Sequence, residues 1–137
     1  MFLGEYQLKF SAKGRIILPR KLRQSLGDEK LIILSRGFEG CIWGFSKKGF
    51  EEEAHKTLGS SATEERARML RRYLFSGSEP VELDSQGRFV IPSALLTYAN
   101  VKDDVVIVGA GDHFEIWNNK FWKKHLKIIE RDYGRVS

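Results

Sequence analysis

A repeat within the sequence constrains this chain more than any other feature. The segment Ser11-Ala-Lys-Gly-Arg-Ile-Ile-Leu-Pro19 recurs in the same order as Asp84-Ser-Gln-Gly-Arg-Phe-Val-Ile-Pro92. In each copy, a polar stretch ending in Gly-Arg leads into a short apolar run that a proline ends. Because proline has no N–H for strand pairing and suits the first turn of a helix, this order predicts a turn, a strand and a helix start.

The correspondence between the copies continues beyond this segment. After one inserted residue, Leu31-Ile-Ile-Leu34 matches Val105-Val-Ile-Val108, and Ile42-Trp43 matches Ile116-Trp117. The repeated unit is therefore strand, turn, strand, short helix, strand, strand. A unit this short rarely buries enough surface to fold alone. We expect the two copies to intertwine into one domain with pseudo-twofold symmetry.

Local patterns refine the expected elements. The run Ile16-Ile-Leu18 is uniformly apolar, which favours a strand that is buried rather than half-exposed. Gly27 and Asn100 stand at corresponding places after the two short helices, and both suit the left-handed conformation that ends a helix. We expect Tyr6, Leu8 and Phe10 to share one face of the first strand.

The residues outside the two copies predict helices. We expect one helix near Lys48 to Leu58 and another that runs to about Phe75. The capping-box pattern Ser61-Ala-Thr-Glu64 favours the start of the second helix. Its expected apolar stripe consists of Met69, Leu70, Tyr73 and Leu74.

The fold class that follows is α+β and rich in β-structure. We expect a first repeat over 5–47, inter-repeat helices over 48–77, a second repeat over 78–120 and a C-terminal helix over 121–137.

Composition restricts the class of protein. With 137 residues, 42% hydrophobic and 30% charged, the chain suits one globular domain. The single cysteine, Cys41, excludes an internal disulfide and lies in an apolar setting that favours burial over reactivity. No apolar run approaches the roughly 20 residues of a membrane helix, and the first residues lack signal-peptide features. We expect a cytoplasmic protein with no membrane partner.

Positive charge is concentrated in the first copy. The formal net charge is +5, and the span from Lys9 to Arg23 holds no acidic residue. The matching span of the second copy carries Glu82 and Asp84 against Arg88 alone. We infer that the first copy faces a polyanion and that the second keeps its turn for structure, with Asp84 capping that turn or pairing with a cation. The cations of the first span are Lys9, Lys13, Arg15, Arg20, Lys21 and Arg23.

The first turn has the chemistry of a nucleic-acid contact. Gly14 would let a phosphate or base edge approach the backbone, and Arg15 supplies a planar fork of donors that suits guanine or a phosphate. The remaining cations of the span would mainly neutralise phosphates. A solvated basic face on a basic protein is the alternative interpretation, and the residues alone leave both open.

The whole pattern resembles the MraZ family, transcriptional regulators encoded at the head of the bacterial division and cell-wall gene cluster. The resemblance runs from Met1-Phe-Leu-Gly-Glu-Tyr6 through both Gly-Arg turns and Arg71-Arg-Tyr-Leu-Phe-Ser-Gly77 to Phe114-Glu-Ile-Trp117. It implies two AbrB/MazE-type swapped-hairpin repeats in a double-split β-barrel. It also implies a ring-shaped homo-oligomer that is nucleoid-associated and binds repeated short double-stranded DNA elements upstream of its own operon.

Carried over by position, the resemblance places the DNA-contacting turn on Ser11 to Arg15, with Arg15 as its principal cation. The family usually has Asp where this chain has Ser11, whereas the second copy keeps Asp84 with Gly87 and Arg88 as its structural turn. A serine hydroxyl caps a turn more weakly than a carboxylate. We therefore expect a less rigid first turn that is more favourable to anions.

The arginines Arg66, Arg68, Arg71 and Arg72 allow three interpretations: DNA contact, subunit contact, or a solvated helix face. For metal binding, His113 and Glu115 could share one side of a strand, but the sequence shows no third convergent ligand. No Walker loop, nucleophile elbow or Cys/His pairing is present. We expect no catalytic residue, cofactor, metal or small-molecule substrate.

Two rival functions remain. The first is a structural or protein-binding ring whose basic face serves an acidic protein partner. The second is an antitoxin-like AbrB/MazE module that binds DNA and a toxin, although such modules commonly have one repeat and a disordered tail.

Overall fold

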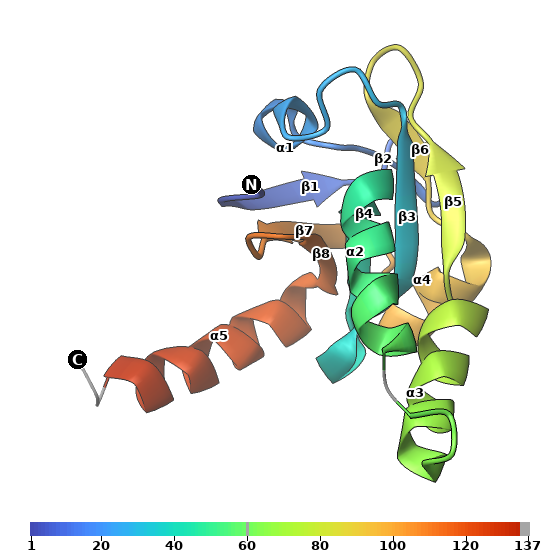
Figure 1. Cartoon of the computed structure of the whole chain (residues 1–137). Coiled ribbons are helices and arrows are strands. Elements are labelled where there is room, and N and C mark those ends of the chain that lie inside the picture. The colour runs from blue at the N-terminus through green and yellow to red at the C-terminus, as the bar shows by residue number, and fades with distance from the viewer. Residues whose placement is uncertain (60, 135–137) are drawn as a thin grey trace.

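The strands form two antiparallel layers. The structure, a computed structural model, describes residues 1–59 and 61–134. A six-stranded sheet has the order β1-β7-β8-β4-β3-β5, and a separate two-stranded ribbon pairs β2 with β6 (Figure 1). The strands are β1 (Glu5–Lys9), β2 (Arg15–Ile17), β3 (Leu31–Arg36), β4 (Ile42–Ser46), β5 (Glu79–Glu82), β6 (Arg88–Val90), β7 (Asp104–Gly109) and β8 (Phe114–Asn118).

The two repeats exchange strands, as expected from the sequence. β1 of the first repeat pairs with β7 of the second, and β5 of the second pairs with β3 of the first. The ribbon joins one strand from each repeat, with Ile16 opposite Phe89. Neither repeat therefore completes its strand pairing without the other.

The core lies between the ribbon and the larger sheet. Ile16 and Phe89 of the ribbon join it, together with Leu22 of α1 (Arg20–Gln24) and Leu95 of α4 (Ser93–Ala99). The expectation of a wholly buried run at Ile16–Leu18 was wrong, because Ile17 is 40% exposed. The ribbon covers the core with one face only, so alternate side chains point to solvent.

The predicted left-handed residues after the two short helices are confirmed, although α1 ends at Gln24 with Ser25 as its C-cap, before the predicted Leu26. Asn100, the residue that ends α4, has a left-handed backbone at φ +51°, and Gly27 after α1 has φ +63°. These positions correspond in the two copies. The repeat therefore preserves backbone geometry where the side chains differ.

The inter-repeat helices are α2 (Lys47–Leu58) and α3 (Glu65–Ser76), and the start of α3 differs from the prediction. Ser61 does not cap the helix, since its Oγ lies 2.7 Å from Oγ1 of Thr63 and its carbonyl accepts from Glu64 N–H. The predicted apolar stripe was also wrong in part. Met69 is 59% exposed, whereas the buried side chains of α3 are Ala67 and Leu74, because only that stripe turns towards the body of the protein.

The C-terminal helix α5 (Asn119–Gly134) projects from the rest of the molecule (Figure 1). It begins earlier than the predicted residue 121, because Oδ1 of Asn118 accepts hydrogen bonds from the N–H groups of Lys120 and Phe121. The predicted stretch over 135–137 lies outside the described residues. Within the described ranges, no helix is long and apolar enough to cross a membrane. A short 3-10 helix, η1 (Phe38–Gly40), links β3 to β4.

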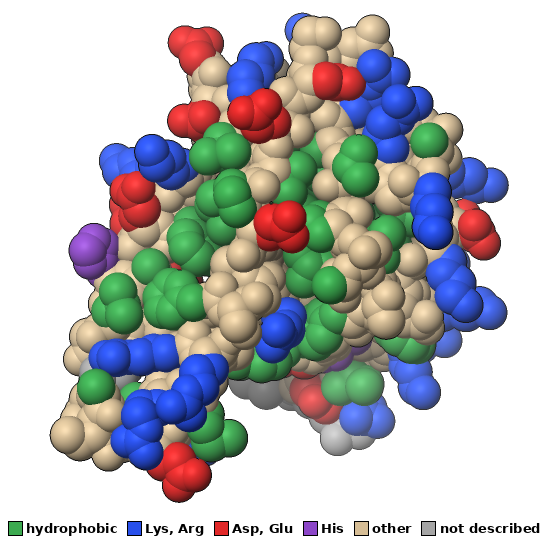
Figure 2. All heavy atoms as spheres, turned by 90° about the vertical axis from the view of Figure 1, so that its right-hand side faces the viewer, with side chains coloured by type: hydrophobic (Ala, Val, Ile, Leu, Met, Phe, Trp, Pro, Cys, Tyr) green, Lys and Arg blue, Asp and Glu red, His purple; other side chains and the backbone are tan. Residues whose placement is uncertain are grey.

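The positive charge of the surface is divided. Figure 2 views the molecule from the side on which α3, α4 and β5 lie in Figure 1. Lys and Arg side chains form one group at the lower left and another along the right-hand edge, with apolar side chains between them.

Candidate nucleic-acid interface

The outward face of the β2–β6 ribbon carries two arginines and two apolar side chains. Arg15 lies opposite Val90, and Ile17 lies opposite Arg88. Residues opposite each other in an antiparallel pair point to the same side, so these four share one face while Ile16 turns into the core. Val90 is 55% exposed at this face. A two-stranded ribbon of this kind fits the major groove of DNA.

The two Gly-Arg turns lie at opposite ends of the ribbon and are held by the opposite repeat. The N–H of Leu18 donates to the carbonyl of Gly87 at 2.9 Å, and the N–H of Ile91 donates to the carbonyl of Gly14 at 2.8 Å. Both glycines have positive φ, +73° at Gly14 and +83° at Gly87, which other residues rarely adopt. The turns therefore share one backbone design.

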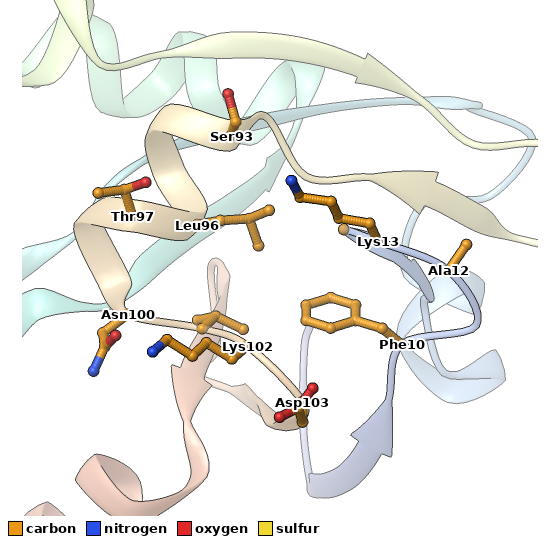
Figure 3. A pocket seen from close by; sticks show the side chains of 11 residues that line it. Phe10, Ala12, Lys13, Ser93, Leu96, Thr97, Asn100, Lys102 and Asp103 are labelled. Atoms are coloured by element: carbon orange, nitrogen blue, oxygen red, sulfur yellow. The ribbon is translucent and has the colours of Figure 1, made fainter.

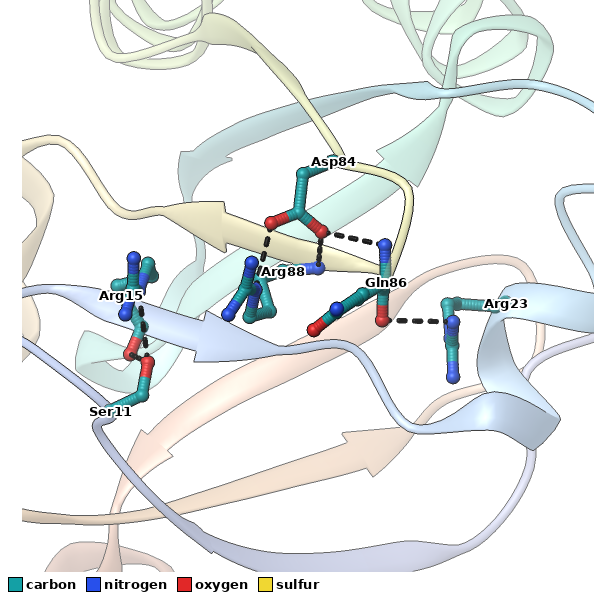
Figure 4. A network of polar contacts seen from close by, with 6 residues as sticks. All are labelled: Ser11, Arg15, Arg23, Asp84, Gln86 and Arg88. Carbon is teal, nitrogen blue, oxygen red and sulfur yellow. Dashed lines mark hydrogen bonds and ion pairs between the residues drawn. The ribbon is translucent and has the colours of Figure 1, made fainter.

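A carboxylate holds the second turn. Oδ1 of Asp84 accepts hydrogen bonds from the N–H groups of Gln86 and Arg88, each at 2.9 Å, and Oδ2 accepts from Nε of Arg88 at 2.7 Å (Figure 4). The backbone hydrogen bond from Arg88 is the main reason that the pKa of Asp84 falls to about 2. The prediction that Asp84 caps its own turn is confirmed. The charge of Arg88 is thereby paired with a carboxylate of the same chain.

A hydroxyl takes that place in the first turn. Nε of Arg15 donates to Oγ of Ser11 at 3.0 Å, and no described carboxylate forms an ion pair with Arg15. The serine thus orients the guanidinium without neutralising it. Arg15 and Arg88 hold corresponding positions on the ribbon, but only Arg15 keeps its charge available to an outside anion.

The other predicted cations do not gather around the first turn. Lys13 is exposed within it, and Lys9 lies at the end of β1, 4.0 Å from Oδ1 of Asp104. Arg20 and Lys21 are exposed on α1, which follows β2 and so lies at the end of the ribbon beside the second turn. The cationic segment seen in the sequence is therefore split across the two ends of the ribbon.

Arg23 has a structural position. Its Nη1 donates to the carbonyl of Gln86 at 3.0 Å, and a Cβ on Gly87 would lie only 2.4 Å from its Cδ. The side chain therefore packs across the second turn (Figure 4). The sequence alone places Arg23 with the DNA contacts, because it does not show which turn each cation lies beside.

The comparisons with known proteins agree with the repeat architecture. The family model for the MraZ protein, described as antitoxin-like, matches residues 1–73 and again residues 74–132. The chain belongs to the MraZ family. The two matches correspond to tandem MraZ repeats, one for each of the Gly-Arg turns described above.

Proteins named as transcriptional regulators MraZ match this chain over most of their length. The transcriptional regulator MraZ of Heliobacterium modesticaldum and that of Halothermothrix orenii are each 36% identical over 137 residues, which is all of this chain and 94% of theirs. The transcriptional regulator MraZ of Roseiflexus castenholzii is 38% identical over 130 residues, covering 95% of this chain and 90% of its own. The family is a non-enzymatic one.

In this MraZ family member, two of the ambiguous arginines hold the connection between α2 and α3. Nη1 of Arg68 donates to the carbonyl of Ala62 at 3.1 Å, and Nη2 of Arg71 donates to the carbonyl of Leu58 at 3.0 Å. Arg66 and Arg72 are exposed. The cluster therefore has a structural half and a surface half.

The residues weighed as metal ligands do lie together, but they bind each other. Nδ1 of His113 lies 2.7 Å from Oδ1 of Asp112, and its Nε2 lies 2.9 Å from Oε2 of Glu115. Burial lowers the pKa of His113, but the bonds to the two carboxylates outweigh it and the net shift is upward. Across 1–59 and 61–134, no three His, Cys, Asp or Glu side chains converge as a metal site would require.

The thiol of Cys41 is fully buried, as the sequence indicated. Burial raises the pKa of this thiol far above its usual range, so it stays protonated. A reactive role is accordingly disfavoured.

Proposed function

We propose that this chain is a DNA-binding transcriptional regulator that contacts the major groove with the outward face of the β2–β6 ribbon and the first Gly-Arg turn. The observation that carries the proposal is the guanidinium of Arg15, which a neutral hydroxyl orients while its counterpart Arg88 is paired with Asp84. The relatives named as transcriptional regulators support the same function.

The ribbon face divides the contacts by kind. Arg15 is suited to a bidentate bond with guanine O6 and N7, and the exposed Ile17 and Val90 are suited to thymine methyl groups. Lys13 beside Gly14 would neutralise a phosphate at one end of the ribbon, and Arg20 with Lys21 would do so at the other. Phosphate contacts at both ends would align the ribbon along the groove.

The finer features of the proposal rest on the resemblance to the family. We propose AbrB-like repeats closed as a double-split β-barrel, in a cytoplasmic, nucleoid-associated ring. Each subunit would present one basic turn to direct repeats upstream of the operon at the head of the division and cell-wall cluster. Weak contacts would then add through effective concentration.

The test is a titration of the DNA upstream of the chain's own gene at fixed salt, followed by fluorescence anisotropy. Arg15→Ala is expected to weaken specific binding by about 1–3 kcal/mol per engaged subunit, as for loss of a bidentate base contact. Arg131→Ala, on the projecting α5, removes the same charge away from the ribbon and serves as the control. Equal affinity of Arg15→Ala and the unchanged chain would refute the assignment.

The antitoxin-like description of the family keeps one rival in view, a module that also binds a protein toxin. A protein-binding ring with an acidic partner is the other. The protein-binding ring differs from the proposal in salt dependence, because the logarithm of affinity for DNA should fall linearly with the logarithm of salt concentration as counterions are released. If the affinity for promoter DNA does not change with salt concentration, the ring with an acidic protein partner would be favoured.

A further inference from the structure

A cavity of about 660 Å³ opens between the first Gly-Arg turn and α4 (Figure 3). Phe10, Leu96 and Val101 supply its apolar lining, and Lys13, Thr97 and Lys102 contribute polar groups. Its volume lies within the roughly 300–1,000 Å³ typical of small-ligand sites. The cavity shares Lys13 and Gly14 with the turn that we assign to DNA.

The pseudo-twofold relation explains why this cavity is beside the first turn. Leu96 corresponds to Arg23 in the repeat, and Arg23 lies across Gly87 and donates to the carbonyl of Gln86. Leu96 approaches Gly14 in the same way, with Cδ1 3.2 Å from where a Cβ on Gly14 would lie, but it is shorter and has no donor. The long cationic side chain that packs across one turn is thus replaced by a short apolar one at the other.

The charges around the cavity favour an anion. Neither Lys13 nor Lys102 forms an ion pair with any residue in the described parts of the chain. Ser93 and Thr97 of α4 are also among the residues that line the cavity. The carboxylate of Asp103, which lines it too, disfavours a second negative charge.

We propose that this cavity binds a small amphipathic monocarboxylate. Its apolar body would lie on Phe10, Leu96 and Val101. Its carboxylate would bind Lys13 and Lys102 once these exposed side chains, whose ammonium groups point apart in Figure 3, turn towards it. Lysine ammonium groups donate charge-assisted hydrogen bonds to carboxylates.

Such a ligand would regulate the proposed DNA site, and this step rests on the proposed function. A carboxylate at Lys13 neutralises a cation that a phosphate would otherwise contact. Because coupling between two sites is reciprocal, the ligand lowers affinity for DNA by the same factor as DNA lowers affinity for the ligand. We expect a decrease of about fivefold or more.

The test uses 2-naphthoate as the probe and the full chain labelled with ¹⁵N, observed by amide correlation spectra without DNA. Saturable shifts are expected at Gly14, Leu96 and Val101. Lys102→Gln should weaken the affinity about tenfold, as expected for loss of a charged hydrogen bond. Lys120→Gln, the same change on α5, should leave the affinity for 2-naphthoate unaltered. Leu96→Arg should block the cavity, because the new side chain would lie across the first turn as Arg23 lies across the second.

Neutral 2-naphthamide distinguishes recognition of the carboxylate from apolar adsorption. Equal affinity for the amide and the carboxylate, shifts confined to α5, or no effect of Lys102→Gln would each overturn the site. Anisotropy with promoter DNA at saturating 2-naphthoate then tests the coupling, which unchanged DNA affinity would refute. Failure of the chain to bind promoter DNA in the absence of the probe would refute the proposed function instead. It would leave the cavity site standing, because the 2-naphthoate titration contains no DNA.

Discussion

At the scale of single residues, one difference between the copies decides which arginine is available. Ser11 and Asp84 occupy the same place, and each contacts the guanidinium four residues later. The carboxylate also accepts two backbone N–H groups, so it fixes the second turn while it neutralises Arg88. The hydroxyl can orient Arg15 but cannot neutralise it.

This difference predicts the effect of Ser11→Asp. The new carboxylate should pair with Arg15 and bond the turn as Asp84 does, which raises the melting temperature and weakens DNA binding. The loss of affinity should reach about fivefold per engaged subunit, within the range of an exposed ion pair. Asp84→Ser is the reciprocal control, expected to lower the melting temperature. Tighter DNA binding by Ser11→Asp would contradict the role given to the hydroxyl.

The lowered pKa of Asp84 predicts a pH dependence of stability. In the folded protein its pKa is about 2, below the ordinary value of 3.8 for an aspartate, so the folded state favours the ionised form. Its contribution is present above pH 3.8 and is lost as pH falls towards 2. Asp84→Asn should therefore be less stable than the unchanged chain at pH 7, with the difference shrinking below pH 3.8, as measured by urea unfolding at each pH. A difference that stays constant down to pH 2 would contradict this assignment.

At the scale of elements, the repeat predicted most of the strands and the ends of the short helices, but not the pairing of the ribbon. Periodicity alone does not show that β2 pairs with β6. The sequence therefore predicts a buried Ile17 and does not reveal that Ile17 lies opposite Arg88 on the exposed face of the ribbon. The same pairing divides Lys13 from Arg20, which the sequence had placed in one patch. The capping pattern at Ser61 failed because Ser61 and Thr63 bond each other.

The close fit of the first turn predicts a cost for Gly14→Ala. A Cβ there would meet Cδ1 of Leu96 at 3.2 Å and the carbonyl oxygen of Ile91 at 3.3 Å, in addition to the strain of its positive φ. Gly27→Ala is the matched control, because Gly27 also has positive φ but has nothing within 4 Å of the added Cβ. Gly14→Ala should lose about 1–3 kcal/mol more of unfolding free energy than the control, as overpacking does. Equal losses of unfolding free energy in the two variants, measured by chemical denaturation, would show that the first turn can accommodate a Cβ at Gly14 without a steric clash.

At the scale of the whole molecule, exchange of strands makes the two repeats one unit. The first strand of each repeat pairs with a strand of the other within one six-stranded sheet, and the core contains side chains from both. Small domains of this kind usually unfold in one cooperative step. The repeats should therefore share a single transition although only the first supplies the cations assigned to DNA.

Two single-tryptophan variants test that cooperativity. One retains Trp43 in the first repeat and the other retains Trp117 in the second, with the remaining tryptophans replaced by Phe. In each variant, the unfolding midpoint measured by tryptophan fluorescence should equal the midpoint measured by circular dichroism, which reports the secondary structure of the whole chain. A fluorescence midpoint that differs from the circular dichroism midpoint in either variant would show that the repeats unfold separately.

The account as a whole depends on the unequal roles of two arginines at equivalent positions. The most direct measurement compares Arg15→Gln and Arg88→Gln, each of which removes one charge from the ribbon, in promoter DNA titrations at one salt concentration. Arg15→Gln should weaken specific binding by about 1–3 kcal/mol per engaged subunit. Arg88→Gln should chiefly lower the melting temperature and leave affinity near that of the unchanged chain. Equal losses of affinity, or a larger loss for Arg88→Gln, would contradict the account.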